Sequence, residues 1–126
     1  MTPAQFRDAI MILDVRDLDA ALRFYGEQLG FALDFRNEQA PHNYAGIRRG
    51  DVLLHMQWQS EDAFRDGTAG HLRVRIDVDD PDALYAEYSA RGVPGLGPAP
   101  ADTSWGAREF AFRDPDGNHL AFFMDH

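Results

Sequence analysis

A chain of 126 residues with 44% hydrophobic side chains is long enough to build one packed domain and too short for two unrelated ones. Its 12 basic and 21 acidic residues give a net charge of −9, which excludes nucleic acid and anionic lipid as favoured partners and attracts cations. The absence of cysteine excludes disulfides and thiolate chemistry, so we expect a cytoplasmic protein. No segment has the ~18 apolar residues of a membrane helix, and Met1 to Asp8 lacks the pattern of a secretory signal.

The first half of the chain predicts a strand, a helix, a second strand and a hairpin. Ala9 to Val15 is a strand-like run, and Asp17 follows it in position to cap a helix. The helix ends at Gly30, where a left-handed residue is favoured, and its apolar stripe consists of Leu18, Leu22, Tyr25 and Leu29. Runs rich in aromatic and β-branched residues predict the remaining strands, at Phe31–Arg36, Tyr44–Arg49 and Val52–Trp58.

The second half repeats this order. Leu13 to Ala20 reappears as Ile76 to Ala83, displaced by 63 positions, which is half the chain. We therefore expect one domain, residues 1–126, made of two β-α-β-β-β modules at about 7–58 and 71–126. Gln59 to Gly70 is polar and without a strong period, which indicates a linker at 59–70.

Within the second module the same signals recur with one gap. A strand at Leu72–Val78 precedes a helix from Pro81 to the stop signal at Gly92. The Gly- and Pro-rich stretch Val93 to Pro100 suits a central strand poorly, so the middle strand of this module stays open. The turn sequence Asp114 to Gly117 separates two further strands, Arg108–Arg113 and His119–Met124.

These motifs in this order resemble the vicinal oxygen chelate superfamily, which includes glyoxalase I, extradiol dioxygenases and bleomycin-resistance proteins. The resemblance rests on the duplication and on Val15–Ala20, Phe24–Tyr25, Leu29–Phe31 and Asp114–Asn118. It implies an α+β fold in which the two modules form a curved, crevice-lining mixed sheet. One such fold hosts many chemistries, so the resemblance does not by itself fix the function.

A narrower resemblance points to the bleomycin-resistance proteins. It is carried by Trp105 to Pro115 and by Tyr44 to Gly46. It implies a homodimer whose two crevices each hold one cationic, metal-chelating glycopeptide. Those proteins often carry a Pro in the first strand, where it acts as the hinge of strand exchange between subunits. Met11 to Val15 has no Pro, so strand exchange stays open.

The resemblance also implies where a catalytic metal would be held. Counting from its motifs, the four positions are Ile10, His55, Arg73 and Ala121, and only His55 offers a donor. A divalent ion needs several N or O donors, so we expect no metal and no other cofactor. A site built from His55 and His71 is the remaining alternative, and it would suit a metal-dependent glyoxalase-like lyase or transferase, or an extradiol dioxygenase with atypical ligands.

A metal-free crevice would bind its ligand through aromatic walls and a few polar groups. The expected ligand-binding residues lie near strand ends and loops: Asp34, Phe35, Tyr44, His55, Trp58, Trp105 and Glu109. Four of them also suit a structural role. The rings of Phe35 and Tyr44 suit hairpin packing, Trp58 suits the end of a strand, and Glu109 suits a pair with Arg108.

The sequence thus favours a binding protein over an enzyme. We expect it to sequester a small planar, cationic, bleomycin-like antibiotic, with aromatic rings stacking on the ligand and the acidic surface attracting it. A binder of another planar metabolite would differ only in its ligand.

Overall fold

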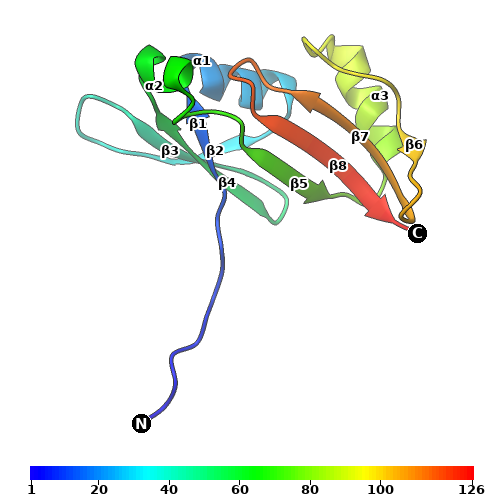
Figure 1. The fold of residues 1–126 in the computed structure, drawn as a ribbon, viewed down its shortest axis with the longest axis horizontal. Helices are drawn as coiled ribbons and strands as arrows, with labels where there is room; N and C mark the ends of the chain where they lie inside the picture. The colour runs from blue at the N-terminus through cyan, green and yellow to red at the C-terminus, as the bar shows by residue number, and fades with distance from the viewer.

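The computed structural model describes residues 1–126 and contains two four-stranded mixed sheets with helices packed against them (Figure 1). The predicted α+β class is therefore confirmed. Each half of the chain builds one sheet by the same rule. In both, the first strand lies parallel to the last strand of its own half, and the two middle strands continue the sheet antiparallel.

The first sheet has the order β1-β4-β3-β2. Its strands are β1 (Ile12–Val15), β2 (Ala32–Arg36), β3 (Tyr44–Arg49) and β4 (Val52–Trp58). A bulge between Leu33 and Phe35 shifts the register of β2 on β3, so that Phe35 lies opposite Gly46. The predicted strand at 9–15 is three residues too long, because Ala9 to Met11 is not part of the strand that pairs with β4.

The second sheet has the order β5-β8-β7-β6. Its strands are β5 (Arg73–Asp77), β6 (Ala101–Asp102), β7 (Ala107–Arg113) and β8 (His119–Asp125). The strand left open by the sequence is β6. It has only two residues, which agrees with the poor strand propensity of the Gly- and Pro-rich stretch before it.

Side-chain caps begin all three helices at the residues that the local chemistry favours. Asp17 and Asp80 accept from the free backbone N–H groups of α1 (Leu18–Arg23) and α3 (Pro81–Arg91), each at 3.0 Å. The first helix continues as a π-helix, η1 (Phe24–Gln28), which the sequence did not predict. This wider turn lets the consecutive residues Phe24 and Tyr25 both reach the core.

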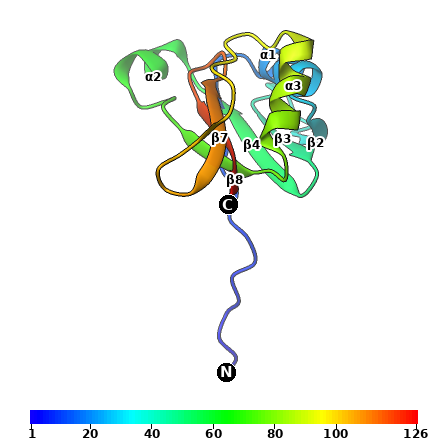
Figure 2. The ribbon, with the colours of Figure 1, turned by 90° about the vertical axis from the view of Figure 1, so that its right-hand side faces the viewer.

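The predicted linker contains an unpredicted helix, α2 (Glu61–Asp66), whose first turn is capped by Ser60. None of its residues is buried, so it has no apolar face that periodicity could reveal. Figure 2 shows α2 apart from α1 and α3, which lie together on one side.

The two halves share one core of 20 buried residues. Polar contacts join them across the junction. The Tyr25 hydroxyl donates to the buried carboxylate of Asp114 at 2.7 Å, and the Tyr88 hydroxyl donates to the backbone carbonyl of Leu29 at 2.9 Å. The Asn118 amide donates to the backbone carbonyl of Asp14 at 2.9 Å. The halves are therefore held as one packed unit, with sheet faces left open to solvent.

The N-terminal segment, residues 1–10, extends away from this body (Figure 1). All of its residues are exposed, including the ring of Phe6. The longest helix, α3, has 11 residues, and no helix in the structure has the length and apolarity needed to cross a membrane.

Candidate functional site

The structure brings three of the predicted ligand residues, Phe35, Tyr44 and His55, together on the open face of the first sheet. We call these three side chains the aromatic cluster. Along β4, His55 alternates with the buried Leu54 and Met56, so its ring lies on the face away from the core. The register places Gly46 between Phe35 on one side and His55 on the other.

Ring contacts define the geometry of the aromatic cluster. The centroids of Phe35 and His55 are 5.0 Å apart and those of Tyr44 and His55 are 5.3 Å apart, both edge-on. Phe35 and Tyr44 are stacked with centroids 6.2 Å apart. The Tyr44 hydroxyl also hydrogen-bonds the Nδ1 atom of His55 at 2.7 Å. The aromatic cluster thus combines fixed rings with an exposed edge, since Phe35 remains 39% exposed.

Gly46 makes this arrangement possible. A Cβ atom at residue 46 would lie 2.2 Å from Cε1 of Phe35, much closer than carbon atoms can approach. The Phe35 ring therefore occupies the space that any other side chain at 46 would fill. The sequence showed Gly46 only as part of the Tyr44–Gly46 resemblance and gave no sign of this role.

Two other predicted residues lie at the borders of the first sheet. Asp34 is the bulge residue of β2, and its carboxylate is 3.8 Å from the Arg48 guanidinium. Trp58 ends β4 with 50% of its surface exposed. By strand alternation Trp58 belongs with Met56, on the face opposite His55.

Trp105 and Glu109 belong to the second sheet instead. Trp105 is 67% exposed in the turn between β6 and β7, which lies at the far end of the molecule from β2 and β3 (Figure 1). Glu109 lies on the open face of β7, where its carboxylate accepts from Arg75 at 3.1 Å. Within one chain, therefore, the structure does not bring Trp105 to the aromatic cluster.

The residues present do not fit a metal. Of the four positions implied by the resemblance, Ile10 lies in the exposed segment before β1, and Arg73 and Ala121 lie in the second sheet. His71, the alternative ligand, precedes β5 and lines a small cavity that does not include His55. No group of three or more His, Asp or Glu side chains converges on one point.

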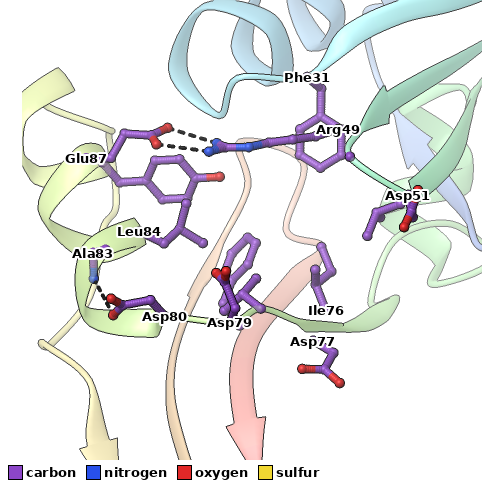
Figure 3. A pocket seen from close by; sticks show the side chains of 15 residues that line it. Phe31, Arg49, Asp51, Ile76, Asp77, Asp79, Asp80, Ala83, Leu84 and Glu87 are labelled. Carbon is purple, nitrogen blue, oxygen red and sulfur yellow. Dashed lines mark hydrogen bonds and ion pairs between the residues drawn. The ribbon is translucent and has the colours of Figure 1, made fainter.

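Sequence reasoning missed a cavity of about 590 Å³, which lies where the two halves meet (Figure 3). Its floor is apolar and includes Phe31, Ile76 and Phe122. Its rim is acidic, with Asp51 and Asp77 among the carboxylates there. The floor residues were visible in the sequence only as core residues, because they come from both halves of the chain.

An ion pair spans this cavity from β3 to α3. The Arg49 guanidinium donates to both carboxylate oxygens of Glu87, at 2.8 and 2.9 Å, and to the Leu29 carbonyl at 2.8 Å. The Arg49 hydrogen bond holds the pKa of Glu87 below its ordinary value, and burial raises the pKa of the neighbouring Tyr88 to about 12. The cation at the cavity is therefore neutralised within the protein, and the pair ties the two halves together.

Comparison with known proteins agrees with this architecture. The profile of the Glyoxalase/Bleomycin resistance protein/Dioxygenase superfamily matches residues 8–122. A bleomycin resistance protein from Geobacillus stearothermophilus and one from Staphylococcus aureus are each 27% identical over 129 residues, covering 92% of this chain and 95% of theirs.

Solved structures give the same picture. The bleomycin-binding protein of Streptomyces verticillus, complexed with copper(II)-bleomycin, is 32% identical with a TM-score of 0.76, covering 98% of this chain and 100% of that one. A bleomycin resistance determinant encoded on the transposon Tn5 is 26% identical with a TM-score of 0.78, over 96% and 99% of the two chains. This chain belongs to the glyoxalase/bleomycin resistance protein/dioxygenase superfamily.

Proposed function

We propose that this protein binds and sequesters a planar, cationic, bleomycin-like antibiotic, and so confers resistance without altering the ligand. The observation that carries the proposal is the aromatic cluster, which lies on an open sheet face in a chain whose relatives are bleomycin resistance and bleomycin-binding proteins. Ring stacking supplies contact area, and the net charge of −9 attracts a cation. The protein adds no metal or cofactor of its own in this proposal.

We propose further that the working form is a homodimer. One chain carries the aromatic cluster on its first sheet and Trp105 beside its second, so a crevice that uses both draws on two chains. Large apolar side chains exposed on or beside the first sheet support this, because such surface favours a partner: Ile10, Met11, Ile12, Leu33 and Phe35. A cytoplasmic location suits such a chain and remains part of the proposal.

Titration with copper-bleomycin tests the function, with heat or tryptophan fluorescence as the readout. We expect saturable binding at micromolar ligand and about tenfold or greater weakening in both Tyr44→Ala and Trp105→Ala, because each removes a stacking ring. Trp58→Ala removes a ring of the same kind from the opposite sheet face, so it should weaken copper-bleomycin binding less. Absence of saturable binding in the unaltered protein rejects the proposal.

Elemental analysis supplies a second, independent check. Protein purified without chelator should contain no stoichiometric divalent metal, because the residues at the implied positions do not form a ligand set. A tightly bound zinc, manganese, iron or nickel ion would instead favour a metal-dependent enzyme.

A further inference from the structure

The open face of the second sheet carries a row of three basic side chains. Arg73 of β5, His119 of β8 and Arg113 of β7 are register partners on three neighbouring strands. Each alternates with buried residues of its own strand, so the three side chains lie on the side away from the core. We call these residues the cationic row. Adjacent strands are about 4.8 Å apart, so the row spans roughly 10 Å.

The cationic row is unusual because its arginines have no acidic partner. All 12 basic residues are arginine, and eight of them have a carboxylate within 4.0 Å. The other four are Arg7, Arg23, Arg73 and Arg113. Like charges on neighbouring strands destabilise a sheet, and the 21 acidic residues of the chain offer many possible partners. Arg113 donates to the Gly117 carbonyl at 3.0 Å, but two arginines without a carboxylate partner lie on either side of one histidine.

His119 responds to this environment. Burial lowers the pKa of His119, and the positive charges of Arg73 and Arg113 lower it further. Glu109 opposes the shift, but its carboxylate is already bound by Arg75, whose guanidinium also lies 4.1 Å from the Phe123 ring centroid. The Glu109 carboxylate is thus used by another arginine.

The row continues into a cavity of about 330 Å³ that Arg113 also lines. His71 also lines this cavity, as does Arg16, which pairs with Glu61 and with Asp116, the cavity's one acidic residue. His71 has a φ of +62°, in the left-handed region that non-glycine residues rarely adopt. Such backbone strain persists only where the surroundings hold it, and it is found preferentially at binding sites.

We propose that Arg73, Arg113 and His119 form a binding site for a small anion bearing phosphate or carboxylate oxygens, with His71 at its edge. Guanidinium groups bind such oxygens through paired, charge-assisted hydrogen bonds. Their flexible stems allow the two arginines to close on one multivalent anion above His119. The row lies on the same open face as Glu109 and so borders the proposed antibiotic crevice, but anion binding there does not require the antibiotic proposal to hold.

Inorganic pyrophosphate and citrate are the probes, titrated separately at neutral pH and followed by calorimetry and backbone amide NMR shifts. We expect saturable binding, with the largest amide shifts at the residues of the cationic row. Whichever of pyrophosphate and citrate binds with higher affinity shows whether the site prefers phosphate or carboxylate oxygens. The double variant Arg73→Gln/Arg113→Gln should bind about tenfold more weakly or worse. The matched control is Arg7→Gln/Arg23→Gln, which removes the other two unpaired arginines and the same total charge, and it should bind as the unaltered protein does.

Equal weakening in the control would show that only net charge matters and would overturn the proposal, as would the absence of saturable binding. Thermal unfolding without anion checks that the row variant is folded. The Tm of this variant should be at least that of the unaltered protein, because the substitutions remove repulsion between like charges. A lower Tm together with lost binding would assign the row a structural role instead. The unaltered protein is titrated with copper-bleomycin in a separate experiment, so that failure of the anion site and failure of the antibiotic proposal remain distinguishable.

Discussion

Gly46 shows how a residue without a side chain can shape a binding surface. The Phe35 ring lies directly over it, so Gly46→Ala must displace that ring and break its contacts with Tyr44 and His55. We expect Gly46→Ala to lower the free energy of unfolding by about 1–3 kcal/mol, the usual result of overpacking, and to weaken copper-bleomycin binding. Denaturant unfolding and ligand titration measure the two effects.

Gly26→Ala is the matched control for this substitution. A Cβ atom at residue 26 would approach only the Phe31 carbonyl, at an ordinary contact distance of 3.5 Å. Gly26 also lies within η1, where alanine is favoured over glycine. If both variants lost the same stability and affinity, the close fit between Phe35 and Gly46 would not be the cause.

Two buried tyrosine hydroxyls at the junction donate to acceptors of different charge. Tyr25 donates to a charged acceptor, Asp114, whereas Tyr88 donates to the neutral Leu29 carbonyl. Hydrogen bonds to charged groups contribute more, so Tyr25→Phe should cost about 1.5–3 kcal/mol and Tyr88→Phe about 1 kcal/mol. Chemical denaturation of both variants checks the order. A larger loss in Tyr88→Phe would contradict the role given to the Asp114 charge.

Helices and strands with strong local signals were predicted well from the sequence. Asp17, Asp80, Gly30 and Gly92 marked helix ends by local chemistry, and both glycines have the left-handed φ expected there. The helix α2 was missed because a six-residue helix that buries nothing has no apolar period. The π-turn η1 was missed because it depends on tertiary burial of Phe24 and Tyr25, which a local pattern does not record.

The ion pair between β3 and α3 makes a pH-dependent contribution that can be measured. Arg49 lowers the pKa of Glu87 in the folded protein relative to its ordinary value of 4.5. A carboxylate with a lowered folded pKa stabilises the fold above its unfolded pKa, and this stability is lost as the pH falls through the folded value. Glu87→Gln should therefore lower the free energy of unfolding at pH 7. In this variant the free energy of unfolding should also fall less as the pH drops from about 5 to about 3.

Urea unfolding at a series of pH values measures this dependence. Glu27→Gln serves as the control, because Glu27 is exposed and has no basic side chain within ion-pair distance. The control should keep the pH dependence of the unaltered protein. An identical pH profile in Glu87→Gln and the unaltered protein would show that this pair does not couple the halves.

The sequence predicted the duplicated α+β fold, but of the site it predicted only a list of residues and not how they converge. The rings of Phe35, Tyr44 and His55 converge because a bulge in β2 shifts its register by one residue. No sequence signal marked that bulge. The pair between Arg49 and Glu87 joins residues 38 positions apart, so it becomes visible only once the halves are packed.

The placement of Trp105 leads to the final prediction. The aromatic cluster and Trp105 lie on different sheets of one chain, so in the proposed homodimer each crevice would combine the aromatic cluster of one copy with Trp105 of the other. Tyr44→Ala and Trp105→Ala should then each damage both crevices of their own homodimer. A mixed dimer of the two variants should contain one doubly damaged and one intact crevice.

Refolding an equal mixture of the two variants tests this arrangement. Random pairing gives half mixed dimers, so about a quarter of all crevices should recover the unaltered affinity for copper-bleomycin, whereas each variant alone recovers none. Sedimentation equilibrium must first show a dimer, and the same mixture combined without refolding supplies the control. If refolding restores no high-affinity sites, the two rings do not act across the subunit boundary, because a crevice built within one chain would carry one substitution in every copy.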